Sequence, residues 1–297
     1  MLLQSMIELS GKILSSKIKE DLSKSIKEKV DEGHRPPCLV TILVGDDPAS
    51  KVYVVNKEKA CNAVGINNIT KVLPEDTIEE ELIDLIQCYN WNLEVDGILV
   101  QLPLPKHIDS KKVLKAVWPS KDVDGFHPNN VAGLWSGTEH IAPCTPSGIM
   151  KLIDDTGINL EGKHVVVIGR SNIVGLPVAK MCLDRNATVS ICHSKTKDLR
   201  EITSQADVLI VAIGKPNFIK NMHLKIGAVV IDVGINRVDG KLYGDVDYES
   251  IGLKASYATP VPGGVGPMTI ACLLTNTYEC YVRNELTHKG RNLGQLV

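Results

Sequence analysis

The sequence predicts an α/β fold with two domains, each with a mainly parallel sheet flanked by helices. Strand-like runs alternate with helical stretches over most of the chain, which is the pattern of such sheets. The 297 residues are enough for two domains. A stretch rich in Pro, Gly and Asn, at about 119–146, separates two series of elements. We therefore expect one domain at 1–142, completed by a C-terminal helix at 268–297, and a second at 143–267.

Periodicity and turn residues define the first series. Its expected elements are a helix at 10–32, a strand at 38–44, a helix from Ser50 to about Val64, a helix at about 77–90 and a strand at 97–101. The first helix spaces its apolar residues three and four positions apart, with Lys and Glu between them. Ser50 is a typical residue at a helix start, and Gly65 a typical one after a helix end.

The second series has the order of a Rossmann-type dinucleotide-binding domain. Apolar runs predict strands at 165–168, 188–192, 207–213 and 228–233, with a helix after the first of them. The loop 259–267 then leads to the closing helix, which is most regular over 268–285. The last dozen residues are polar, and we expect them to be frayed.

Composition excludes several classes of function. The 33 Lys and Arg residues nearly balance the 35 Asp and Glu residues, so we expect no nucleic-acid partner. The N-terminus has Glu8 among its apolar residues, unlike a secretory signal, and no apolar run reaches the roughly 20 residues that span a membrane. The eight Cys and eight His residues lack the spacing of a metal site, and we expect reduced, mostly buried thiols in a cytoplasmic protein.

A glycine turn follows the first strand of the second domain. The segment 164–180 has the pattern of a strand, a turn and a helix. In such a segment the backbone amides of the turn and the helix N-terminus point toward a bound phosphate. Its match to G-x-G-x-x-G is imperfect: Gly169 fills the first place, Ser171 the second and Val174 the third, with Gly175 one residue late. The alternative is an ordinary tight turn, but the strands that follow favour a dinucleotide site.

The end of the second strand distinguishes NADP from NAD. A carboxylate there usually binds the ribose 2′-hydroxyl of NAD, whereas this strand ends in His193-Ser194-Lys195-Thr196. These groups, with Arg170, favour the 2′-phosphate of NADP, unless Arg170 and Lys195 are simply solvated. Turns 212–216 and 232–236 complete the expected pocket. The expected NADP contacts are Gly169, Arg170, Ser171, Ile173, Val174, Gly175, His193, Ser194, Lys195, Thr196, Ala212, Gly214 and Ile235.

A Tyr-x-x-x-Lys pair lies in the first domain. Tyr53 and Lys57 project from one face of a helix, one turn apart. The pair is similar to the proton relay of short-chain dehydrogenases, but there it follows the nucleotide loop, and here it precedes Gly169 by over a hundred residues. A surface pair with no function is the alternative from these two residues alone.

Seven motifs together identify a family. They are A-S-K-V-Y-V-V-N-K-E-K-A (49–60), V-Q-L-P-L-P (100–105), K-D-V-D-G-F-H-P (121–128), P-C-T-P-S-G (143–148), G-R-S-N-I-V-G-L-P (169–177), C-H-S-K-T (192–196) and P-V-P-G-G-V-G-P-M-T (260–269). In this order and nearly end to end, the chain resembles the bifunctional methylenetetrahydrofolate dehydrogenase/methenyltetrahydrofolate cyclohydrolase family. The resemblance implies NADP-dependent oxidation of 5,10-methylene- to 5,10-methenyl-tetrahydrofolate, then hydrolysis to 10-formyl-tetrahydrofolate. It also implies a homodimer and a cleft between the two domains.

The resemblance also implies a set of folate-site residues. They are Tyr53, Lys57, Gln101, Leu102, Pro103 and Asp124 from the first domain, with the loop Pro262, Gly263 and Gly264. Tyr53, Lys57, Gln101 and Asp124 are the expected catalytic residues: a lysine amine can transfer a proton near neutral pH once burial or a nearby cation lowers its pKa. Gln101 would orient that amine or the water, Asp124 would accept from the pterin N–H groups, and Tyr53 would stack beside the folate.

One departure from the family and two alternative functions stay open. Ala132 stands where the family usually has Gly, which puts the conformation of that linker in doubt. Asp124 before Gly125 could be a turn-forming residue, and Gln101 an incidental amide at a strand end. A dehydrogenase that lacks the hydrolase step is one alternative function. A non-catalytic dinucleotide-sensing module is the other, although it would not need the four catalytic residues together.

Overall fold

The computed structural model describes residues 5–293, which cluster by their contacts into two units. The three-stranded unit comprises Lys17–Cys144 and the chain from Ile270 onwards, and the six-stranded unit comprises the chain up to Ser16 and Thr145–Thr269. The latter unit contains the N-terminal strand, whereas the expected first domain included all of 1–142. The physical reason is that β1 (Ile7–Glu8) pairs with β11 (Ala255–Ala258) of the six-stranded sheet.

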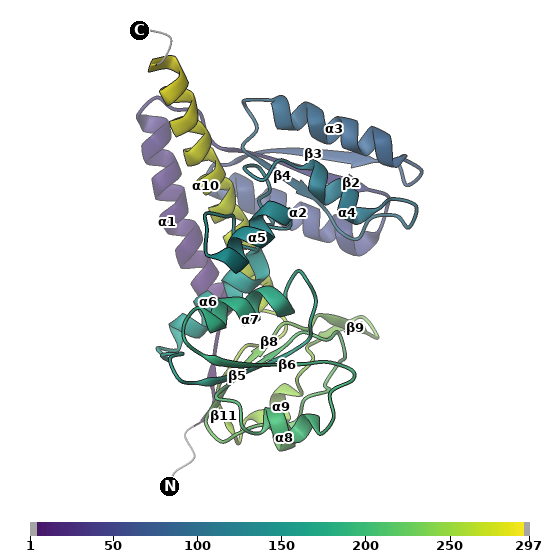
Figure 1. The fold of residues 1–297 in the computed structure, drawn as a ribbon, viewed down its shortest axis with the longest axis vertical. Coiled ribbons are helices and arrows are strands. Elements are labelled where there is room, and N and C mark those ends of the chain that lie inside the picture. Colours follow the sequence, from purple (N-terminus) through teal and green to yellow (C-terminus); the bar gives the residue numbers. More distant parts are fainter. Residues whose placement is uncertain (1–4, 294–297) are drawn as a thin grey trace. The chain divides into compact units, whose positions relative to one another are not determined.

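The three-stranded unit is a parallel sheet with helices on both faces. The strand order is β3 (Asn67–Leu73), β2 (Cys38–Val44), β4 (Gly97–Val100). Leu39 of β2 packs with α1 (Gly11–Asp31), α2 (Pro48–Val64) and α10 (Val265–Leu293), while its neighbour Val40 packs with α3 (Glu79–Trp91) and α4 (Ser110–Ala116). Because β2 is buried on both faces, all seven of its residues are buried. Figure 1 shows α1 and α10 side by side.

The six-stranded unit is a doubly wound parallel sheet. Its strand order is β1, β11, β8 (Ala228–Asp232), β7 (Val208–Val211), β5 (His164–Ile168), β6 (Thr188–Cys192). Short helices connect the strands: α6 (Cys144–Asp155), α7 (Gly175–Leu183), α8 (Leu199–Thr203) and α9 (Tyr248–Ile251), with a 3₁₀ turn at Asn221–His223. A small antiparallel pair, β9 (Asn236–Val238) and β10 (Lys241–Tyr243), follows β8. The order reverses at β5, which lies between β6 and β7, and such a reversal is where open α/β sheets bind ligands.

The expected α/β class and parallel sheets are confirmed, with shifted ends for some elements. The second helix begins at Pro48, not Ser50, because Asp47 caps it: its carboxylate accepts from the Ser50 backbone N–H at 2.7 Å. Gly65, at φ 89°, ends this helix as expected. The closing helix begins at Val265, three residues before its expected start.

Several short elements were not predicted. They are β1, β3, β9, β10, β11, α4, α6, α8, α9 and α5 (Pro128–Ser136). Helix α5 contains Ala132, so the departure from the family's usual Gly falls at an ordinary helical position. The neighbouring Gly133 is the residue that lacks space, since a Cβ there would lie 2.7 Å from Cβ of His140.

Three further observations concern the described part of the chain. Seven of the eight cysteines are buried, as expected, and all eight are free thiols. Between residues 5 and 293, no helix is long and apolar enough to cross a membrane. Within the same residues, no group of three or more His, Cys, Asp or Glu side chains is arranged to hold a metal ion.

Candidate active site

The three-stranded unit brings Lys57 and Gln101 together. Lys57 lies on α2 and Gln101 directly follows β4, and Nζ of Lys57 donates to Oε1 of Gln101 at 3.0 Å. The other end of the amide is also fixed, because Nε2 of Gln101 donates to the carbonyl of Leu102 at 2.7 Å. Both side chains are half-buried. The amide oxygen of Gln101 therefore fixes the orientation of the Lys57 amine. Because this oxygen is neutral, it does not hold a proton on the amine as a carboxylate would.

Asp124 is electrostatically coupled to this pair. It is partly buried, and burial raises the pKa of its carboxyl above the ordinary value, while the Lys57 ammonium acts in the opposite direction. Burial also raises the pKa of the Cys144 thiol well above its usual range. The thiol donates to the carbonyl of Val123 at 3.2 Å, so Cys144 serves as a neutral neighbour of the carboxylate.

Buried amides and a second carboxylate hold the Asp124 loop. Nδ2 of Asn276, on α10, donates to the carbonyls of Val123 and Ala142, both at 2.8 Å. Asp122 accepts from the His127 backbone N–H at 2.7 Å and from Nδ2 of Asn130 at 2.9 Å. Burial raises the pKa of Asp122, and these two donors offset part of that rise. The loop that carries Asp124 is thus fixed on both sides.

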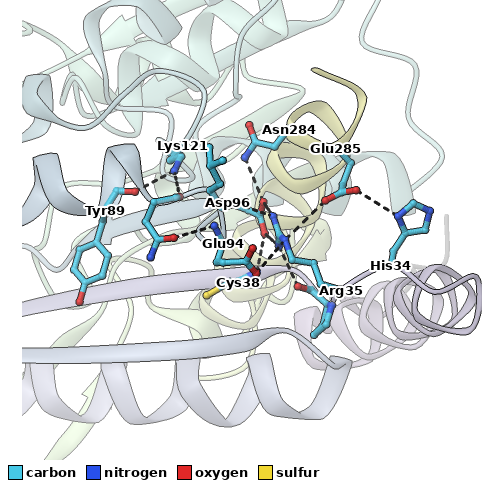
Figure 2. A network of polar contacts seen from close by, with 12 residues as sticks. His34, Arg35, Cys38, Tyr89, Glu94, Asp96, Lys121, Asn284 and Glu285 are labelled. Atoms are coloured by element: carbon cyan, nitrogen blue, oxygen red, sulfur yellow. Dashed lines mark hydrogen bonds and ion pairs between the residues drawn. The ribbon is translucent and has the colours of Figure 1, made fainter. Parts of the chain in front are cut away.

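A buried lysine anchors the turn that leads into this loop. Nζ of Lys121 donates to the carbonyls of Tyr89 and Asn92, at the C-terminus of α3, at 3.0 and 2.7 Å (Figure 2). Burial lowers the pKa of Lys121 to about 8, and the negative charge of Asp96 acts against this. Figure 2 also shows Asp96 beside Arg35, whose guanidinium donates to both carboxylate oxygens at 2.7 and 2.8 Å.

The other expected folate contacts lie in two different units. Tyr53 is on α2, one turn before Lys57, with an exposed ring, and Leu102 and Pro103 follow Gln101. Pro262, Gly263 and Gly264 belong to the six-stranded unit, just before α10. The Gly263 carbonyl accepts from the Lys12 backbone N–H at 3.1 Å, and a Cβ on Gly264 would lie 2.7 Å from the Pro260 carbonyl oxygen. This loop therefore requires glycine.

The turn after β5 has the shape of a phosphate site. Gly169 has φ 123°, and a Cβ there would collide with the backbone of Ala212. A Cβ on Gly175 would lie 2.7 Å from the carbonyl carbon of Gly169. Oγ of Ser171 accepts from the backbone N–H groups of Val174 and Gly175, at 3.2 and 3.3 Å, and so caps α7. Both glycines are thus required by close backbone packing. The tight turn from Gly169 to Gly175, called the dinucleotide cradle below, leads into the N-terminus of α7, and this arrangement fits the pyrophosphate of a dinucleotide.

The turn after β6 presents hydroxyl and cationic groups. The His193 backbone N–H donates to Oγ1 of Thr196 at 2.8 Å, and Nδ1 of His193 accepts from the Lys195 N–H at 3.1 Å. Ser194 and Lys195 are exposed, as are Arg170 and Ile173 in the preceding turn. The fixed backbone of 193–196 directs these polar side chains outward. The turn has no carboxylate to repel a 2′-phosphate.

The turns after β7 and β8 are tied together by buried carboxylates. Asp245 accepts from the backbone N–H groups of Ile213, Gly214 and Lys215, at 2.7 to 2.9 Å. Asp232, at the end of β8, accepts from the Asp245 N–H, and burial raises the pKa of Asp232 to about 7. Ala212 and Gly214 lie on the first of these turns, and the exposed Ile235 lies on the second.

Two family models match the chain. The tetrahydrofolate dehydrogenase/cyclohydrolase catalytic domain matches residues 9–124, and the NAD(P)-binding domain of the same family matches 143–285. The chain belongs to the tetrahydrofolate dehydrogenase/cyclohydrolase family. The resemblance inferred from the seven motifs is thereby confirmed.

Individual members of the family are similar over nearly their full length. The bifunctional protein FolD of Campylobacter hominis is 56% identical over 91% of this chain and 95% of its own. The crystal structure of the Campylobacter jejuni FolD dehydrogenase/cyclohydrolase has a TM-score of 0.91 at 52% identity, covering 93% of this chain and 98% of that one. The Trypanosoma brucei enzyme, crystallised with NADP and an inhibitor, has a TM-score of 0.90 at 36% identity, covering 94% and 98%.

For this family member, sequence reasoning located the motif residues but not those that support them. Lys57 and Gln101 are brought into contact, and Asp124 is coupled to Lys57. Asp245 and Asn276 were not identified, because each contacts loops 30 or more positions away and no local pattern indicates the pairing.

Proposed function

We propose that this chain oxidises 5,10-methylenetetrahydrofolate to 5,10-methenyltetrahydrofolate with NADP, and hydrolyses that product to 10-formyltetrahydrofolate. The observation that carries the proposal is the hydrogen-bonded Lys57–Gln101 pair, coupled to Asp124. A dehydrogenase that does not hydrolyse the methenyl product would not need the Lys57 amine to be oriented by the Gln101 amide. The family of the chain and the two activities named for its relatives support the same reading.

Hydrolysis is assigned to the three-stranded unit. Water adds to the methenyl carbon and loses a proton, and one carbon–nitrogen bond then breaks as that nitrogen is protonated. Lys57 is proposed to accept and return the proton, with Gln101 as the group that aims it. Asp124 would accept from the pterin N–H groups, Tyr53 would lie beside the folate, and Leu102 and Pro103 would line the pocket.

The nucleotide is assigned to the six-stranded unit. Bound NADP would take up the hydride that leaves the methylene carbon. The turn from Gly169 to Gly175 would hold its pyrophosphate, and Arg170, Ser194 and Lys195 its 2′-phosphate. The remaining proposed contacts are Ile173, His193, Thr196, Ala212, Gly214 and Ile235, and the loop Pro262–Gly264 is proposed to contact folate. Binding fixes the orientation of the reactants, which is the main contribution that residues of this kind make.

We further propose a cytoplasmic homodimer that pairs through the nucleotide-binding unit. Strand β6 lies at one edge of the six-stranded sheet, and its Ile191 is exposed. An exposed edge strand offers unpaired backbone groups to a second copy of the chain. The free thiols are consistent with a reducing compartment.

The proposed activities are tested with the wild-type protein. It is mixed with methylenetetrahydrofolate and either NADP or NAD, and absorbance is followed for the appearance and decay of the methenyl product. We expect both phases, with a preference for NADP. If the methenyl product appears but does not decay, the protein is a dehydrogenase without the hydrolase activity. If it neither appears nor decays, a non-catalytic module is favoured. A preference for NAD would overturn the roles of Arg170, Ser194 and Lys195.

Lys57→Met tests the assignment of the proton-transfer group. We expect hydrolysis of methenyltetrahydrofolate to fall by roughly 100- to 10,000-fold, since a positioned acid–base group contributes about that much. NADP binding, measured by calorimetry, should stay unchanged. Lys59→Met is the matched control, because Lys59 is exposed on the same helix. A hydrolysis rate in Lys57→Met equal to that of the control would refute the assignment.

A further inference from the structure

Two carboxyl groups are buried beneath the nucleotide-binding turns. Asp245 is fully buried and Asp232 is 4% exposed. They are linked directly, since the Asp245 backbone N–H donates to Oδ1 of Asp232 at 2.9 Å. Asp232 lies at the end of β8, and Asp245 follows β10. Burying two acids costs free energy that only specific hydrogen bonds can offset, so their partners indicate their role.

All the hydrogen bonds of the Asp245 carboxylate go to the neighbouring turns. Oδ2 accepts from the backbone N–H groups of Ile213 and Gly214, at 2.7 and 2.9 Å. Oδ1 accepts from the Lys215 N–H at 2.7 Å and from Nδ2 of Asn236 at 2.9 Å. Three successive N–H groups that converge on one anion form a nest, a shape that often binds phosphate. Here a side chain of the protein fills the nest.

Asp232 fixes the position of the backbone at Asp245 and at the residues beside it. Its oxygens accept from the N–H groups of Gly234, Asp245 and Val246, each at 2.9 Å. The Asp232 N–H itself donates to Oγ1 of Thr259 at 2.8 Å. A Cβ on Gly244 would lie 2.9 Å from Cγ2 of Val261, and one on Gly234 would collide with Asp245. Close packing and hydrogen bonds on both sides therefore restrain the backbone of Asp245.

The turn held by Asp245 forms one wall of the dinucleotide cradle. Ala212 immediately precedes the three bonded amides, and a Cβ on Gly169 would lie 3.1 Å from the Ala212 carbonyl carbon. Displacing 213–215 would therefore move the surface against which Gly169 is packed. Through Asn236, the same carboxylate also restrains the turn that carries Ile235.

We infer that Asp245 is a positioning residue for NADP binding, which fixes the turns 212–215 and 234–236 without contacting the nucleotide. The inference rests on the proposed function, because it assumes that NADP occupies the cradle at Gly169. Loss of the Asp245 carboxylate should weaken NADP binding. Hydrolysis of methenyltetrahydrofolate requires no nucleotide and uses Lys57, Gln101 and Asp124 of the other unit, so it reports the folding of that unit. The kcat at saturating NADP reports whether the unit that carries Asp245 is still folded.

Asp245→Asn is the principal test. The substitution keeps the shape of the side chain but turns one oxygen into an NH₂ group, which then faces two N–H donors. We expect the KM for NADP to rise roughly ten- to a hundredfold, as is typical for the loss of charge-assisted hydrogen bonds. The kcat at saturating NADP and the hydrolysis rate should stay close to the wild-type values. Calorimetric titration with NADP should give the same loss of affinity.

Two companion variants keep the test decisive. Asn236→Ala removes a single bond to Asp245 and should shift the KM for NADP in the same direction by a smaller factor, even if Asp245→Asn does not fold. Asp247→Asn is the matched control. Asp247 caps α9 by accepting from the Ser250 N–H at 3.3 Å, so this variant should bind NADP like the wild type.

The possible outcomes separate this inference from the proposed function. Wild-type-like NADP affinity in both Asp245→Asn and Asn236→Ala would overturn the inference alone. An equal fall of hydrolysis and oxidation would also overturn it, because the role would then be general stability. If the wild type itself neither binds NADP nor oxidises methylenetetrahydrofolate, the proposed function fails, and the inference fails with it.

Discussion

At the scale of single residues, the orientation of the Gln101 amide can be assigned from its two partners. Its oxygen accepts from Lys57, and its nitrogen donates to the Leu102 carbonyl. A flipped amide would bring two donors together at one end and two acceptors at the other. The lysine therefore meets a neutral oxygen, which holds it in place without the charge of a carboxylate.

Gln101→Glu should disable hydrolysis while preserving the size of the side chain. A carboxylate in this place would pair with the Lys57 ammonium and hold it charged, and it could no longer donate to the Leu102 carbonyl. We expect the hydrolysis rate near neutral pH to fall about 100-fold, with activity recovering at higher pH. The pH–rate profile of the variant checks this. An unchanged profile would show that Gln101 does not aim the amine.

Single residues also show how far sequence reasoning reaches. The contact between Lys57 and Gln101 agrees with the roles expected for them, since both lie in motifs with a recognisable chemistry. Asp245 lies in no such motif, and the three backbone N–H groups that its carboxylate accepts from are 30 to 32 positions earlier. Hydrogen bonds between distant loops depend on the sheet order, which the linear pattern does not contain.

At the scale of elements, long periodic segments were predicted well and short ones were not. Strand β3 was missed because it lies at the sheet edge, where its side chains are exposed or only half-buried. Its sequence N-N-I-T-K-V-L therefore lacks a continuous apolar run. Helix α5 begins with Pro128-Asn129-Asn130, which local propensity assigns to a loop. The ring of His127 accepts from the Asn129 N–H at 3.0 Å and stabilises this helix start.

The C-terminus of α3 depends on the buried Lys121, and its stability should depend on pH. The pKa of Lys121 is about 8 in the folded chain and 10.5 ordinarily, so the unfolded chain binds more protons between these pH values. The free energy of unfolding contributed by this group therefore rises with pH from 8 to 10.5. Below pH 8 the full cost of burying the charge is present.

Comparison with Lys121→Met isolates this contribution. From pH 8 to pH 10.5 the wild type should gain roughly 1–3 kcal/mol relative to the variant. Urea unfolding followed by tryptophan fluorescence is a suitable measurement, because Trp91, Trp118 and Trp135 all belong to the three-stranded unit. Lys111→Met, at an exposed position of α4, is the control. A difference that does not change with pH would contradict the role of the buried charge.

At the scale of the whole molecule, each unit has its own buried apolar clusters. The three-stranded unit has one on each face of its sheet, around Leu39 and around Val40. The six-stranded unit has one around Val166 and Leu209. The chain passes between the units near residues 16, 144 and 269, and the last two crossings lie within two residues of the divisions predicted after 142 and 267. The first crossing falls inside α1, a regular amphipathic helix, which is why local sequence did not reveal it.

NADP should therefore protect one unit selectively. A ligand that binds only the folded state stabilises it by RT ln(1 + [L]/Kd), about 2.7 kcal/mol at 100 times the Kd. We expect slower hydrogen exchange at the carboxyl ends of β5, β6 and β7, and little change around Gln101 and Asp124. Exchange followed by mass spectrometry, with NAD at the same concentration as the control, measures this. Protection centred on residues 17–144 would contradict the assignment of the nucleotide to the six-stranded unit, whereas weaker protection by NAD would support a role for the 2′-phosphate.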